Sequence, residues 1–163
     1  MESGKDKTPI WQLCGDYAYN LPVMRAAAAW PRPDSAYVYH FERGNYFREG
    51  PPTRGKCTHL LDASYHFLNL NDNMSAEDQK LAIGMAERWI AFANGKEPWT
   101  AYGKPHNALC ITDSCEFVLR SEEEDRQRTE RRWSKWDVGL KIGHEKIWKV
   151  ISVYHAQIDM GED

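Results

Sequence analysis

The residues most suited to acid–base chemistry lie close together around His59. Imidazole is the only side chain whose unperturbed pKa lies near neutrality, so a histidine can accept and return a proton at physiological pH. The nearest candidate nucleophiles and acids are Cys57, Ser64 and Asp62. Neighbours in sequence rarely reach the geometry of a catalytic triad, in which the base contacts both the nucleophile and an orienting acid.

A contact between Cys57 and His59 is conceivable if the segment is extended, because residues i and i+2 of an extended chain point the same way. The commoner role for such a cysteine is that of a buried free thiol. A histidine in a loop bounded by glycine and proline is, by itself, more typical of a surface position. Two further histidines, His40 and His66, lie in aromatic stretches and are interpreted either as core residues with their hydrogen bonds satisfied or as half-buried residues.

The elements before His59 are expected to be a helix, a strand and a loop. The alanine-rich stretch from about Pro22 favours a helix that must end before Pro31 and Pro33. Residues 36–41 (AYVYHF) are β-branched and aromatic and give the clearest strand signal. Residues 43–56 are punctuated by glycine and proline and are expected to form a loop.

The best helix signal follows at residues 75–93, where Ser75 and Asp78 have capping-box spacing and Asn94-Gly95 is a stop signal. Its apolar face is formed by Leu81, Met85, Trp89 and Phe92, all interpreted as core residues. Residues 108–112 and 117–119 are weaker strand candidates. A charged helix is expected from Ser121 and an apolar-faced terminal helix after Leu140.

Composition and charge narrow the class of protein. With 163 residues, 42% of them hydrophobic and 28% charged, the chain is expected to be one soluble domain over residues 1–163, with the polar residues 1–9 disordered. A net charge of −3 gives no basis for nucleic-acid binding. No segment approaches the roughly 20 apolar residues of a membrane span, and no secretory signal is recognised, so the expected location is the cytoplasm.

The four cysteines fit no zinc-binding pattern, and nothing in the sequence indicates a metal or a cofactor. Cys110 and Cys115 could bridge a tight loop in an oxidising compartment, but free thiols are favoured in the cytoplasm. Seven tryptophans and eight tyrosines indicate a large buried aromatic seam or an apolar pocket.

Several segments carry a resemblance to a known family. They are residues 15–19 (GDYAY) with Pro22, residues 37–41 (YVYHF), residues 57–62 (CTHLLD), residues 65–68 (YHFL) and, most specific, residues 89–99 (WIAFANGKEPW). In this order they resemble the C-terminal portion of type-B carboxylesterases, particularly fungal ones. The resemblance implies an α/β fold, namely the C-terminal part of an α/β-hydrolase sheet with flanking helices and an incomplete set of strands.

The same resemblance implies that His59 is the family's catalytic general acid/base. Family members usually have glycine or another small residue after this histidine, whereas Leu60 follows here and Asp62 is the nearest acid. The family's nucleophile elbow, G-x-S-x-G, does not occur in the chain, and its oxyanion-hole glycines and triad acid belong further upstream than the residues before His59 allow.

Two hypotheses follow. In the first, the protein is related to carboxylic ester hydrolases, acts on an apolar small-molecule ester, and needs a complementing chain for its serine. In the second, it is a non-hydrolytic binding or cyclase-like scaffold for an apolar ligand, for example in secondary metabolism. Because half a sheet exposes an edge strand, a stable short form is expected to be a homodimer.

Overall fold

The computed structural model describes residues 14–48, 54–103, 106–128, 136–139, 141–143, 145–149 and 152. They belong to two compact units, one made of residues 1–29 with 125–163 and the other of residues 30–124. The expected disorder of residues 1–9 lies outside the described residues. The single domain expected for residues 1–163 stays a prediction.

In the first unit, η1 (Asp16–Asn20) is a π-helix that runs directly into α2 (Leu21–Ala29). The helix expected from about Pro22 is therefore confirmed, and the residues directly before it are helical as well. The Leu21 backbone amide donates to the Asp16 carbonyl, which closes this wider turn, and the side-chain amide of Asn20 donates to the Asp16 carboxylate at 2.8 Å. A small core packs around these elements, formed by Cys14, Tyr17, Leu21 and Trp136. Most of the expected terminal helix lies outside the described residues.

The second unit contains a mixed sheet in the order β1-β2-β3. β1 (Val38–Phe41) pairs in parallel with β2 (Ala108–Ile111), and β2 pairs antiparallel with β3 (Phe117–Arg120). All three strands coincide with the sequence signals within two residues. β2 is buried along its whole length, whereas β1 and β3 lie at the edges of the sheet.

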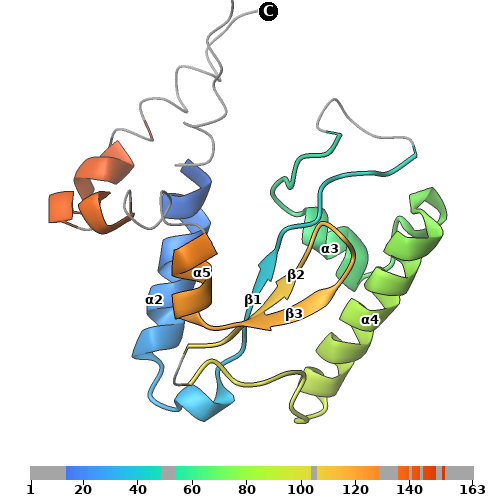
Figure 1. Ribbon diagram of the computed structural model, residues 1–163, viewed down its shortest axis with the longest axis horizontal. Helices are drawn as coiled ribbons and strands as arrows, with labels where there is room; N and C mark the ends of the chain where they lie inside the picture. The colour runs from blue at the N-terminus through green and yellow to red at the C-terminus, as the bar shows by residue number, and fades with distance from the viewer. Residues whose placement is uncertain are drawn as a thin grey trace, which may run out of the picture. The chain divides into compact units, whose positions relative to one another are not determined.

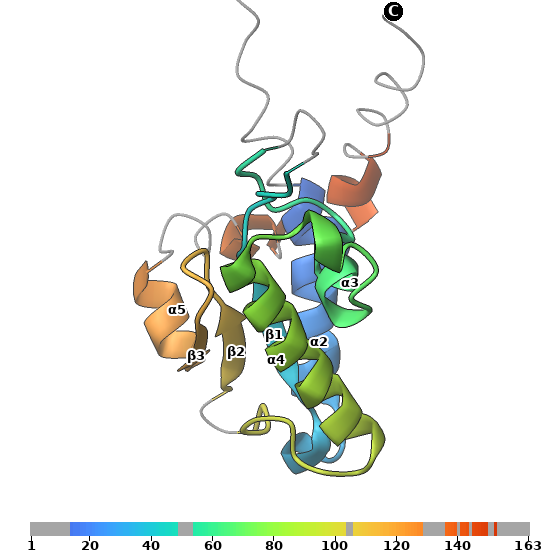
Figure 2. The same cartoon turned by 90° about the vertical axis from the view of Figure 1, so that its right-hand side faces the viewer.

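Helices α3 (Leu61–His66) and α4 (Ala76–Ala93) pack against each other beside this sheet (Figures 1 and 2). Short 3-10 turns, η2 (Pro33–Ser35) and η3 (Asn71–Asn73), precede β1 and α4. After β3 the chain enters α5 (Glu122–Arg128). The mixed three-stranded sheet with flanking helices is that of a partial α/β-hydrolase fold, as the resemblance implied.

Helix α4 begins where its sequence indicated. The hydroxyl of Ser75 accepts the Asp78 amide at 3.1 Å, and Gly95 follows the helix with φ of +70°, the left-handed conformation that glycine adopts readily. One face of α4 enters the core, which comprises Phe47, Leu61, Tyr65, Met74, Leu81, Ala82, Met85 and Ile111. The last residue of the expected apolar face, Phe92, is instead 55% exposed, so it is not a core residue.

Candidate functional site: the histidine loop

His59 lies in the turn that enters α3, at the end of the loop that follows β1. The chain leaves β1 through residues 42–48, here called the outgoing arm, and comes back through residues 54–60, the returning arm. The Cys57 thiol donates to the carbonyl oxygen of Phe41, the last residue of β1, at 3.2 Å. The imidazole of His59, two residues further on, is exposed. In α/β folds reactive side chains gather at the carboxyl ends of the strands, and His59 is placed accordingly.

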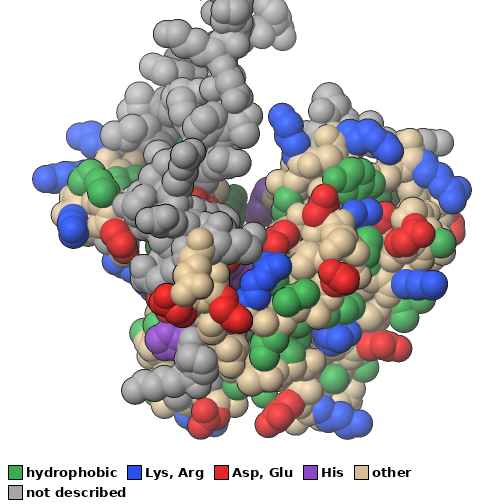
Figure 3. Space-filling view, in the orientation of Figure 1, with side chains coloured by type: hydrophobic (Ala, Val, Ile, Leu, Met, Phe, Trp, Pro, Cys, Tyr) green, Lys and Arg blue, Asp and Glu red, His purple; other side chains and the backbone are tan. Residues whose placement is uncertain are grey.

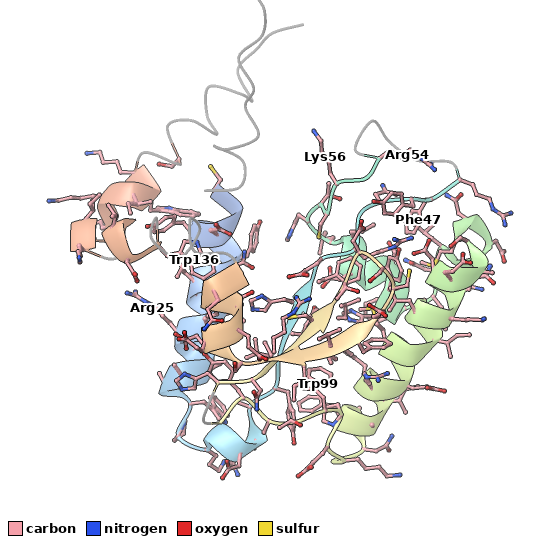
Figure 4. All side chains as sticks on the ribbon, viewed as in Figure 1. Arg25, Phe47, Arg54, Lys56, Trp99 and Trp136 are labelled. Atoms are coloured by element: carbon pink, nitrogen blue, oxygen red, sulfur yellow. The ribbon has the colours of Figure 1, made fainter. Side chains whose placement is uncertain are left out.

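The two arms are joined to each other by their backbones. The Asn45 amide donates to the Lys56 carbonyl at 3.1 Å, and the Gly55 amide donates to the Asn45 carbonyl at 2.8 Å. A Cβ atom on Gly44 would lie 2.9 Å from the backbone of Gly55, so the arms touch at a point where only glycine fits. Figure 4 shows Phe47, Arg54 and Lys56 together at this end of the sheet.

Leu60, directly after the histidine, has φ of +64°, although its side chain is leucine. Left-handed backbone costs an L-residue roughly 1–2 kcal/mol because Cβ crowds the neighbouring carbonyl. The leucine side chain is 63% exposed, so little burial offsets this cost. The turn therefore requires a conformation that glycine adopts freely, which gives a physical reason for the glycine usual at this position in the resembling family.

The other residues near His59 have structural surroundings of their own. The hydroxyl of Tyr39, a residue of β1, donates to Asp62 at 2.6 Å. Burial is the largest cause that raises the pKa of Tyr39 well above its usual range, and the hydrogen bond and charge of the Asp62 carboxylate raise it further. Ser64 is half-buried on α3, and Cys57 is exposed. The sequence interpretation of Cys57 as a buried thiol is therefore wrong, because its thiol bonds a carbonyl at the surface of the loop.

Behind the histidine loop, six aromatic rings pack between β1, α3 and α4: Tyr37, Tyr39, His66, Trp89, Phe92 and Trp99. The ring of His66 lies 3.9 Å from that of Trp89, centroid to centroid. His66 is half-buried, as one of the two interpretations predicted. Its Nε2 is buried without a hydrogen-bond partner among the described residues, so the other interpretation, a satisfied core histidine, is wrong. Burial, only partly opposed by the charge of Asp62, lowers the pKa of His66, which favours the neutral ring.

Sequence reasoning missed the most buried charged contact in this region. Asp78 is fully buried and accepts hydrogen bonds from the Arg43 guanidinium, with Nε at 2.8 Å from Oδ1 and Nη2 at 3.2 Å from Oδ2. Tyr65 donates to the same carboxylate at 2.9 Å, and Ser75 at 2.8 Å. Asp78 had been interpreted only as part of the α4 cap. The available signal was an arginine two residues after the strand, together with a helix whose first turn carries two acidic residues.

Exposed apolar side chains surround α3: Leu60, Phe67, Leu68 and Leu70. Phe67 is 77% exposed, and Leu68, like Leu60, has a positive φ of +54°. On the face shown in Figure 3, apolar side chains likewise lie between charged ones over the part of the molecule that holds α4.

The cysteines are free thiols, Cys110 buried on β2 and Cys115 half-buried in the turn after it. Within the described ranges, no three His, Cys, Asp or Glu side chains come together in a way that could hold a metal ion. A membrane-spanning helix is likewise not found in the part of the chain that the structure describes.

Known proteins were compared with this chain in three ways. Neither a search of curated protein sequences nor one of solved structures gave a match. The model of the carboxylesterase family matches residues 2–137, a range that contains β1, the histidine loop, α4 and the remaining strands. Because this family model matches most of its length, the chain belongs to the carboxylesterase family, and it corresponds to the C-terminal portion of that family.

Proposed function

We propose that His59 is the general acid/base of a carboxylic ester hydrolase whose serine nucleophile is supplied outside the residues of this sequence. The observation that carries the proposal is the position of His59, exposed in a loop whose returning arm is hydrogen-bonded to the last residue of β1. In the reaction His59 accepts the proton of the serine hydroxyl as the serine attacks the ester carbonyl. It then returns that proton to the leaving alcohol.

The substrate we propose is an apolar small-molecule ester. Leu60 supports this, since it directly follows His59 in the chain and its apolar side chain is exposed. Neither a cofactor nor a metal is needed for this chemistry, because serine, histidine and a carboxylate suffice.

A complementing chain or segment is part of the proposal. It would supply the serine, the oxyanion hole and the triad acid, and it would cover the exposed edge of β1 and the apolar side chains around α3. For this chain by itself we expect a homodimer formed through the same surface. Sedimentation that shows a folded monomer at micromolar concentration would contradict the dimer.

A non-hydrolytic scaffold has less support. The rings that could have lined an apolar pocket contact one another, several of them edge to face, for example Tyr39 with Trp89 at 4.9 Å between centroids, which is typical of packed aromatic side chains. A role in secondary metabolism and a fungal source remain hypotheses that rest on the sequence resemblance.

Complementation tests the hydrolase proposal directly. An amino-terminal carboxylesterase fragment that carries the serine elbow, oxyanion hole and triad acid, and that ends before its own histidine loop, is mixed with this chain and assayed with a short-chain nitrophenyl ester. We expect turnover only in the mixture, lost with His59→Ala and retained with the control His106→Asn. Turnover that survives His59→Ala, or a stable complex that never turns over, would contradict the proposal.

The chain alone is treated with a fluorophosphonate and its intact mass is measured. No adduct is expected. A stoichiometric adduct on Ser64 that disappears in His59→Ala would replace the proposal with a self-contained active site.

A further inference from the structure

We propose that Asp113 is a positioning residue for His59: from the tip of the β2–β3 hairpin it holds the outgoing arm, and through it the returning arm that ends at the histidine. The inference rests on the proposed function only in that His59 is taken as the group whose position matters. The contacts that carry it are independent of any activity.

Asp113 binds three residues of the outgoing arm. Its carboxylate accepts the Gly44 amide at 2.9 Å and the Tyr46 hydroxyl at 3.0 Å, and it lies 3.6 Å from the Arg43 guanidinium. Its carbonyl oxygen also accepts from Arg43. Arg43 lies over the ring of Tyr46, 4.3 Å from its centroid, so the three partners contact one another as well. The Asp113 side chain is 58% exposed, yet all of these contacts go to the outgoing arm. Asp113 therefore acts as a clamp, a residue that holds this segment against the hairpin.

The outgoing arm passes this constraint to the returning arm. Gly44, held by Asp113, touches the backbone of Gly55, where a Cβ atom would come within 2.9 Å. Its neighbour Asn45 exchanges backbone hydrogen bonds with Gly55 and Lys56. Cys57 then ties the returning arm to β1, two residues before His59. A continuous series of hydrogen bonds and backbone contacts thus joins the hairpin tip to the histidine.

The hairpin tip is itself rigid enough to serve as the fixed end. The Thr112 amide donates to the Glu116 carbonyl at 2.9 Å, and the Cys115 amide donates to the Thr112 carbonyl at 3.1 Å. The Thr112 and Ser114 hydroxyls are 2.9 Å apart, and Ser114 donates to Glu116 at 2.9 Å. Glu116 therefore bonds within the hairpin, whereas Asp113 reaches out to the loop, and the two carboxylates form a matched pair for substitution.

The experiment compares Asp113→Ala with Glu116→Ala in the full chain, with Asp113→Asn as the conservative variant. NMR of histidine-labelled protein follows the Cε1–H signal of His59 and its titration, and amide hydrogen exchange follows Gly55 and Asn45. We expect Asp113→Ala to speed exchange at these amides about tenfold, the equivalent of one to two lost hydrogen bonds, and to shift or broaden the His59 signal. Glu116→Ala should leave both as in the unchanged chain, and Asp113→Asn should lie between, since its amide oxygen still accepts one hydrogen bond.

Unchanged His59 and Gly55 signals in Asp113→Ala would overturn the proposal. If that variant also disturbs the hairpin amides, Gly44→Ala decides, because it disrupts the same path at the contact with Gly55 and leaves every side chain of the hairpin in place. An unaltered His59 signal in Gly44→Ala then refutes the positioning role, and an altered one supports it. Since the readout is the surroundings of the histidine, a failure here is distinct from a failure of ester hydrolysis in the complementation assay.

Discussion

Arg43 and Asp78 form an ion pair whose carboxylate is completely removed from solvent, while the guanidinium is 13% exposed. The pair connects the first residues after β1 to the first turn of α4, which are far apart in the sequence. A buried charge is tolerated only when it is paired and hydrogen-bonded, and this carboxylate meets that condition with Arg43, Ser75 and Tyr65. The pair therefore joins the outgoing arm to the core of its unit.

Loss of one partner should be costly. Arg43→Met leaves the Asp78 carboxylate buried without its cation, and we expect the free energy of unfolding to fall by about 3 kcal/mol or more, measured by urea denaturation. The control Arg48→Met removes an exposed arginine of the same arm and should change it by no more than about 0.5 kcal/mol. The double variant Arg43→Met, Asp78→Asn should recover part of the loss, and additive effects would contradict the ion pair.

Asp78 should also make the free energy of unfolding depend on pH in the acidic range. Burial alone raises the pKa of this carboxyl, but its hydrogen bonds and the Arg43 charge outweigh burial and bring the pKa below the ordinary value of 3.8. A depressed pKa means that the stabilisation is complete above pH 3.8 and is lost as the pH falls below it. Stability measured against pH should show this loss, and Asp78→Asn should remove that component.

His66 should also make the stability depend on pH, in a range of higher pH than Asp78 does. Because burial lowers its pKa, the unfolded chain takes up a proton below pH 6.5 before the folded chain does. Stability should therefore decline as the pH falls below 6.5, and His66→Phe, which keeps a ring against Trp89, should abolish this decline. A pH profile that is the same in both proteins would show that His66 is not the titrating group.

Leu60→Gly should stabilise the protein. Glycine removes the roughly 1–2 kcal/mol cost of a left-handed leucine. It also lowers the stability by roughly 0.5–1 kcal/mol, because glycine has more conformational freedom to lose when the chain folds. We expect a net gain of about 0.5–1 kcal/mol in thermal or urea unfolding. The matched control is Leu70→Gly, at a residue with φ of −121°, where the same substitution should destabilise.

Gly84→Ala should destabilise although alanine favours helices. A Cβ atom at this point of α4 would lie 2.9 Å from the ring of Phe117 on β3, and that ring is also held under Arg88 at 3.8 Å. We expect a net loss of about 1–2 kcal/mol from overpacking. Phe117→Leu makes room, so the double variant should lose less than the sum of the single ones. Strict additivity would contradict the close contact.

Local signals in the sequence were sufficient for most of the elements. Proline and alanine define α2, Ser75 and Asn94-Gly95 define the ends of α4, and short β-branched or aromatic runs define the three strands. These signals act over a few residues through backbone geometry and capping, so they can be recognised without knowledge of the fold. The motif ending at Trp99 likewise indicated the family that the matched range confirms.

Only the tertiary structure decided which side chains meet. The Arg43–Asp78 pair, the clamp from Asp113 to Gly44, and the contact of Gly84 with Phe117 each join residues more than 30 positions apart. Periodicity predicted Phe92 as a core residue, and the usual role of a free cysteine predicted Cys57 as buried. Both are exposed, because burial depends on which other elements cover a residue, and local patterns do not contain that information. Sequence by itself therefore determined the elements and the candidate histidine, whereas long-range packing determined what holds that histidine in place.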